Sequence, residues 1–142
     1  MATKPWHLPV RLAAGAYILN SGLAKLEASD EHAAQLRGAA ATAFPQFADM
    51  DPQQFVALLS TAEIVLGTAL VAVPFVSPLL AGLGLLGFAG SLNRLYLRAP
   101  GMRHEGTVRP TQQGTPFAKD VWLTGIGAAL VLDSLLAPRR RR

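Results

Sequence analysis

Four stretches of mainly apolar residues dominate the chain and restrict the folds that it can adopt. They cover residues 8–26, 53–73, 76–97 and 117–136. Each has the length of about 20 residues that a helix needs to cross a bilayer. We therefore expect an all-α fold, an integral membrane four-helix bundle that forms a single four-span domain over residues 1–142.

A soluble four-helix bundle is the main alternative to this prediction. Its helices would show a polar stripe every turn, and residues 64–76 and 79–88 have none. Charged residues make up 15% of the chain, against about 25% in soluble domains, which also favours a membrane protein. A cleaved signal peptide is a second alternative for residues 8–26, but Arg11 interrupts that stretch, so we expect a retained helix.

The connections between the stretches differ in character. The connection at residues 74–78 is short and contains proline, so the second and third helices should form a tight antiparallel hairpin. Residues 31–44 are rich in alanine and place apolar side chains on one side, which predicts a short interfacial helix between the first two spans. Residues 98–116 have no periodicity and predict an irregular loop outside the hydrocarbon.

Four crossings place both chain termini on the same side of the membrane. We expect that side to be the cytoplasm, because a compact basic tail at residues 138–142 directly follows the last span. Such a tail beside a span binds anionic lipid headgroups more readily than nucleic acid. Its basic residues are Arg139, Arg140, Arg141 and Arg142.

Glu63 is the only ionisable residue in the apolar part of the second stretch and falls near its midpoint. An unpaired carboxylate at that depth is costly, so Glu63 should face the bundle interior and be protonated or hydrogen-bonded. Asn20 is the polar side chain nearest to it in depth. Two interpretations remain open: a hydrogen bond that fixes helix packing, or a quinone, proton or lipid site.

Other polar side chains lie near the ends of the spans. Arg11 and Asp133 have similar depths near the chain termini, and we expect them to form an ion pair. A second group lies near the opposite boundary, where an anionic headgroup or substrate would join it. This group contains Lys25, Asn93, Arg94, Lys119 and Asp120.

Stripes of small residues occur in three of the four stretches. Small residues let helix backbones approach closely in a membrane, and such stripes usually mark packing within a bundle. We therefore expect them to face other helices of this chain. They consist of Gly15 and Gly22 in the first stretch, Gly84, Gly87, Gly90 and Ser91 in the third, and Gly125 and Ala129 in the fourth.

Several kinds of chemistry are excluded by residue type. The chain has no cysteine, which removes disulfides, iron–sulfur clusters and thiolate metal sites. The three histidines, His7, His32 and His104, lie outside the apolar stretches, so no pair can hold a haem between facing helices. We expect no metal and no cofactor bound by protein ligands, with a quinone as the one cofactor left open.

Short motifs stand in a fixed order in three of the stretches. They are RLAAGAYILNSGLAKL at residues 11–26, Glu63 followed by Gly67, and Lys119 beside Asp120. Together with the four-span pattern they resemble the DoxX-like family. The resemblance implies a small four-helix protein of the bacterial cytoplasmic (inner) membrane. Some relatives are subunits of a thiosulfate:quinone oxidoreductase, and others associate with membrane redox and oxidative-stress complexes; this chain differs from thiol-exchanging relatives in having no cysteine.

From these features we expect a noncatalytic accessory subunit of a larger membrane complex, redox or respiratory in type, in contact with lipids and other integral membrane subunits. One alternative is a quinone-linked oxidoreductase membrane subunit in which Glu63 and Asn20 bind or protonate the quinone. In that case Arg11, Lys25 or Lys119 would stabilise the charge. A second alternative is a small lipid or solute carrier.

Overall fold

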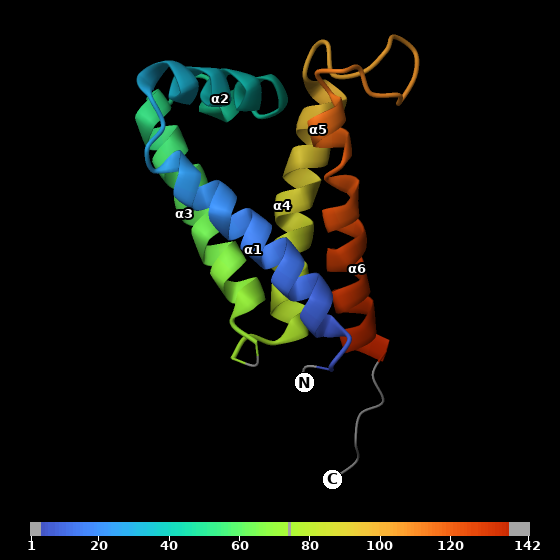
Figure 1. The fold of residues 1–142 in the computed structure, drawn as a ribbon. Coiled ribbons are helices and arrows are strands. Elements are labelled where there is room, and N and C mark those ends of the chain that lie inside the picture. Colours follow the sequence, from blue (N-terminus) through green and yellow to red (C-terminus); the bar gives the residue numbers. More distant parts are fainter. Residues whose placement is uncertain (1–3, 74, 137–142) are drawn as a thin grey trace.

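The computed structural model describes residues 4–73 and 75–136, which form an all-helical fold (Figure 1). Each predicted span is a helix, although the fourth begins later than predicted because a short helix and a turn precede it. Pro74 and the basic tail lie outside the described residues. The long helices are α1 (His7–Lys25), α3 (Pro52–Val71), α4 (Pro78–Arg98) and α6 (Val121–Leu136); the short ones are α2 (Asp30–Ala43), the 3-10 helix η1 (Pro45–Phe47) and α5 (Thr115–Ala118).

Local sequence signals fix where three of the helices begin. Ser29, Asp51 and Ser77 precede α2, α3 and α4, and each side-chain oxygen accepts a hydrogen bond from the backbone N–H three residues later. Proline is the first residue of both α3 and α4, where its missing N–H has no helical partner to lose.

The long helices form two antiparallel pairs, α1 with α3 and α4 with α6. Figure 1 shows the pairs close together where α1 begins and α6 ends, which we call the closed end. The pairs diverge toward the opposite end, the open end, where α2 lies. A shared apolar core joins the pairs; its buried members are Ala14, Ile18, Leu70, Ala81, Leu85, Ala89, Leu123 and Leu130.

Helix α2 covers the open end of α3. Its buried Ala33 packs with Phe55 and Val56 of α3, and Leu36 and Ala40 lie against the same cluster. The apolar side that the sequence assigns to the membrane interface is therefore occupied by protein. The predicted short helix is present, and it finds this apolar surface because α3 extends past the end of α1; its position at a membrane interface stays a prediction.

Glycines allow the closest approach within each pair. A methyl group added at Gly67 of α3 would lie 2.5 Å from the backbone nitrogen of Leu19, and one at Gly22 of α1 would lie 2.9 Å from Cβ of Glu63. In the second pair, a methyl group at Gly82 would lie 2.9 Å from Cβ of Leu130. The predicted packing of the α1 stripe is confirmed.

The small residues predicted to pack inside the bundle from α4 and α6 mostly face outward. A methyl group added at Gly87, Gly90 or Gly125 would meet nothing within 4 Å. The prediction is wrong at these positions because Gly82 and Gly127 form the contact between α4 and α6 instead. Gly84 is exposed as well, but a methyl group there would lie 3.0 Å from the Leu66 side chain of α3, as the prediction requires. The other exposed members, which we call the outward small-residue set, are Gly87, Gly90, Ser91, Gly125 and Ala129.

Large apolar side chains are exposed on all four long helices, among them Leu12 of α1, Val65 of α3, Leu83 of α4 and Leu132 of α6. Within residues 4–73 and 75–136, one helix, α3, is long and apolar enough to cross a membrane by length and composition.

Candidate functional site

Lys25 at the end of α1 and Glu63 in the middle of α3 form a buried ion pair. The Lys25 Nζ lies 2.9 Å from Oε2 of Glu63 and donates a hydrogen bond to Oε1 at 3.2 Å. The Glu63 side chain is 5% exposed and that of Lys25 is 16% exposed. Because both groups have lost most of their water, the pair is stable only if their other polar atoms also find partners.

Ser21 supplies part of this requirement. Lys25 Nζ donates to the Ser21 hydroxyl at 2.7 Å, and that hydroxyl lies 3.4 Å from Oε1 of Glu63 as its donor. Oε2 of Glu63 is buried and lies within ion-pair distance of the Lys25 ammonium group. Among the residues that the structure describes, no donor makes an aligned hydrogen bond to it. We call Ser21, Lys25 and Glu63 the Glu63 cluster.

The predicted partner of Glu63 is wrong. Asn20 is exposed, because it lies two residues before Gly22 and so about 200° around the helix from the face that contacts α3. Depth along the spans placed Lys25 near the boundary, away from Glu63. The structure brings them together because the first turns of α3 extend beyond the end of α1 to meet α2.

The Glu63 cluster is aligned with the shared core. Ser21 and Lys25 follow Ala14 and Ile18 at helical spacing on α1, and both Ala14 and Ile18 pack into the core that contains residues of α4 and α6. The cluster therefore continues the inner side of α1 toward the open end of the fold, where Figure 1 shows the pairs diverging.

Arg11 lies at the other end of the α1–α3 contact and is fully buried. Its guanidinium donates three hydrogen bonds to backbone carbonyls, those of Leu70 at 3.0 Å, Val76 at 2.9 Å and Ala69 at 2.8 Å. The last carbonyls of a helix have no intrahelical donor, and Arg11 supplies one to those near the end of α3. The predicted ion pair between Arg11 and Asp133 is therefore wrong.

Asp133 of α6 instead binds two residues at the start of the described chain. Lys4 Nζ lies 2.7 Å from its carboxylate, and Nε2 of His7 lies 3.0 Å from Oδ2. The backbone N–H of Lys4 also donates to Nδ1 of His7, which leaves Nε2 to donate to Asp133. Sequence reasoning missed His7 because it placed this residue outside the first span; its position four residues before Arg11, on the same helix face, was the available signal.

The residues predicted at the opposite boundary do not gather around Lys25. Asn93 donates to the Thr124 hydroxyl at 2.7 Å, and Arg94 donates to the Ala43 carbonyl. Lys119 is exposed and Asp120 is half-buried, just before α6. Of the predicted site residues Glu63, Asn20, Arg11, Lys25, Lys119 and Asp120, the structure brings together Glu63 and Lys25.

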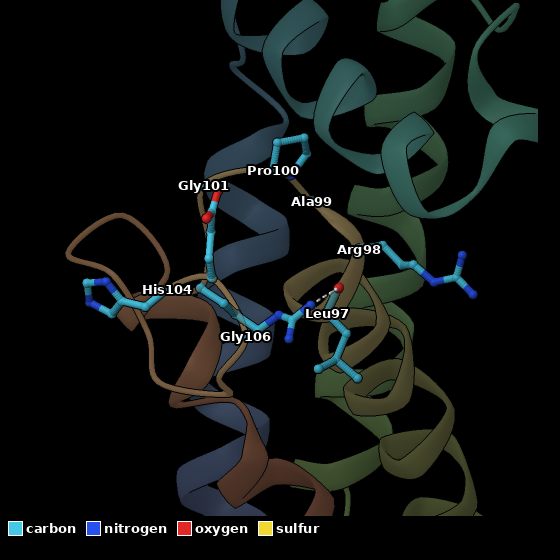
Figure 2. Close-up of a pocket in the computed structure, with 9 residues that line it drawn as sticks. Leu97, Arg98, Ala99, Pro100, Gly101, His104 and Gly106 are labelled. Carbon is cyan, nitrogen blue, oxygen red and sulfur yellow. Dashed lines mark hydrogen bonds between the residues drawn. The ribbon is translucent and has the colours of Figure 1, made fainter.

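A shallow depression of about 250 Å³ lies where the loop after α4 turns back (Figure 2). It is lined by residues 97–101 and 103–106, none of which belongs to the predicted site. Arg103 donates to the Leu97 and Thr107 carbonyls, so its guanidinium holds the loop. Figure 2 shows the Arg98 and His104 side chains pointing outward on opposite sides of this loop.

Within the described ranges, no group of three or more His, Cys, Asp or Glu side chains is placed to hold a metal ion. Comparison with protein-family models, curated proteins and solved structures finds no match to this chain. The resemblance to the DoxX-like family therefore stays a prediction based on short motifs.

Proposed function

We propose that this chain is a DoxX-like protein of the bacterial cytoplasmic membrane that serves as a noncatalytic accessory subunit of a larger redox or respiratory membrane complex. It would cross the bilayer through α1, α3, α4 and α6, with both termini in the cytoplasm. The outward small-residue set on α4 and α6 is the observation that carries the proposal.

The distribution of apolar side chains supports the membrane part of the proposal. Soluble bundles bury their large apolar residues, whereas here each long helix exposes at least two of them. Two exposed tryptophans lie near opposite ends of the bundle, Trp6 before α1 and Trp122 at the start of α6. Tryptophan is enriched at both membrane–water interfaces.

The outward small-residue set supports the subunit part. Between helices in hydrocarbon there is little hydrophobic driving force, so association depends on close packing, which glycine, alanine and serine permit. Gly87 and Gly90 leave space on the outer side of α4 that no residue of this chain fills within 4 Å of an added methyl group. A helix of another subunit would fit against this side of α4.

The test combines native mass spectrometry of gently solubilised membranes with one glycine substitution. Gly87→Leu fills the outer side of α4, and Gly38→Leu is the matched control, because a methyl group there also meets nothing within 4 Å but lies on α2. We expect the wild type and the control in a larger complex and Gly87→Leu without partners. Recovery of the wild-type chain alone, at its own mass of 15.0 kDa, would contradict the proposal.

A second candidate function, a quinone-linked oxidoreductase subunit, is favoured by the Glu63 cluster. A buried carboxylate beside an ammonium group can bind or exchange a proton with a hydroxyl-bearing ring, and Oε2 of Glu63 has an unused acceptor position. Quinol turnover by the purified protein, abolished by Glu63→Gln and kept by Asp133→Asn, would support this candidate. Absence of turnover in the wild-type protein would count against it.

A further inference from the structure

Arg94 makes a polar contact between the two helix pairs at the open end. Its Nε donates a hydrogen bond to the Ala43 carbonyl at 3.0 Å, and its guanidinium lies 4.8 Å from the centre of the Phe44 ring. Ala43 is the last residue of α2, so its carbonyl lacks an intrahelical donor and the helix end favours a cation. Arg94 therefore caps α2 from α4.

Helix α2 itself is fixed to the first pair. Its apolar side packs on Phe55 and Val56 of α3, and Gln53 of α3 donates to the Asp30 carboxylate at 2.7 Å. Arg37 of α2 donates to the Ala48 carbonyl in the segment that leads into α3. A displacement between the pairs would carry α2 with α3 and would break the contact to Arg94.

Polar contacts of a different kind join the pairs at the closed end. Lys4 and His7 bind Asp133 of α6, and Arg11 of α1 binds the Val76 carbonyl just before α4. This arrangement leaves the open end as the place where the pairs can separate, with the closed end as the hinge. Compared with the contacts inside each pair, contacts between α3 and α4 are sparse.

We propose that Arg94 is a releasable latch: it holds α2 against α4, and its release lets the two helix pairs separate at the open end. Separation exposes the inner side of α4, where Leu92 and Phe88 pack against the shared core, and the Glu63 cluster on the facing pair. The inference does not depend on either candidate function.

The chain contains no cysteine, so a single introduced thiol reports local exposure without background. Leu92→Cys places the reporter on the inner side of α4. Ala81→Cys, which lies on the same helix near the closed end and is 1% exposed, reports unfolding of the bundle as a whole. Both reporters are placed in the full chain in lipid nanodiscs, and their rates of alkylation by N-ethylmaleimide are measured. Each rate is compared between the protein that has Arg94 and the Arg94→Gln variant.

Arg94→Gln removes a hydrogen bond from a charged donor. It should raise the population of molecules whose helix pairs are separated at the open end, and with it the alkylation rate at Leu92→Cys, about tenfold. The rate at Ala81→Cys should not change, because the closed end stays joined. Arg94 and Arg98 are both exposed, so Arg98→Gln, one turn further along α4, removes the same charge but keeps the hydrogen bond to Ala43 and should leave both rates unchanged. If Leu92→Cys does not fold, Phe88→Cys on the same side of α4 repeats the measurement.

Two results would overturn the proposal. An unchanged rate at the inner reporter in Arg94→Gln would mean that Arg94 does not hold the pairs together. An equal rise at both reporters would mean that Arg94 stabilises the whole bundle and is not a latch.

Discussion

The two helix pairs solve the same packing problem with different chemistry. Both bring backbones together at glycines, but the α1–α3 contact also contains a buried ion pair, two hydrogen bonds from Arg11 and a hydrogen bond from Ser60 to the Gly22 carbonyl. The α4–α6 contact is mainly apolar, with one side-chain hydrogen bond between Asn93 and Thr124. Polar contacts in an apolar setting are satisfied at only one rotation of each helix about its axis and one offset of the two helices along that axis. The relative position of α1 and α3 is therefore more strongly specified than that of α4 and α6.

The difference also affects what each pair offers to its surroundings. Gly15, Gly22 and Gly67 are used in the contact between α1 and α3. In the second pair Gly82 and Gly127 form the contact, which leaves Gly87 and Gly125 facing outward. The first pair therefore stabilises the fold, and the second carries the surface that we assign to a partner.

Removing the positive charge of the Glu63 cluster should have the largest effect. Lys25→Met leaves the Glu63 carboxylate buried without its partner, and breaking a buried pair in this way costs about 3–5 kcal/mol of unfolding free energy. Denaturant titration in detergent micelles measures the loss. The double variant Lys25→Met with Glu63→Leu should recover most of it, and a loss in Lys25→Met below about 1 kcal/mol would mean that the pair does not specify the α1–α3 contact.

Arg11→Met should come next. It leaves two carbonyl acceptors at the end of α3 and the Val76 carbonyl before α4 without their donor, which we expect to cost about 3 kcal/mol. Leu12→Met, at the neighbouring exposed position, is the control and should have almost no effect. The same titration measures both variants, and equal stability of the two would show that Arg11 is not needed to close α3.

A smaller effect is expected from the glycine contact itself. Gly67→Ala forces a methyl group against the backbone of Leu19, which should cost about 1–3 kcal/mol. Gly87→Ala has open space and should be neutral or stabilising by up to about 1 kcal/mol, since alanine is the better helix former. Thermal unfolding followed by circular dichroism compares them. If both substitutions have the same effect, the close approach of α1 and α3 is not as described.

Asp133→Asn should have the smallest effect. The carboxylate and Lys4 are each about one-third exposed, so salt screens their attraction. We expect the melting temperature of the wild type to decrease as the salt concentration is raised. The melting temperature of Asp133→Asn should depend less on salt. Equal salt dependence of the two proteins would show that this contact adds nothing at the closed end.

Helix periodicity and capping signals predict much of the fold. The four long helices, α2 and the contact face of α1 all follow from apolar spacing and from the positions of serine, aspartate, proline and glycine. The choice of polar partners does not follow. From depth along the spans, we predict that Glu63 pairs with Asn20 and Arg11 with Asp133. In the structure, the offset between α1 and α3 places Lys25 beside Glu63, and Arg11 donates to backbone carbonyls.

The outward small-residue set shows a second limit. Gly82 and Gly87 are five residues apart, so they lie on different sides of α4, and composition alone does not tell which side faces α6. The side of α4 that faces α6 depends on Gly127 of α6, which leaves space for the close approach at Gly82. This is a long-range contact that no local pattern on α4 contains.

Contact between lipid and the exposed apolar sides of the bundle is measured most directly by spin labels in reconstituted bilayers. Single cysteines replace Val65 of α3, Leu83 of α4 and Leu132 of α6, each at least half exposed in the described structure. If the bundle spans the membrane, the labels will collide with dissolved oxygen, which concentrates in hydrocarbon, and will be shielded from a water-soluble nickel chelate. Labels that are relaxed by the chelate and not by oxygen would show that water surrounds these helices, and the membrane assignment would be wrong.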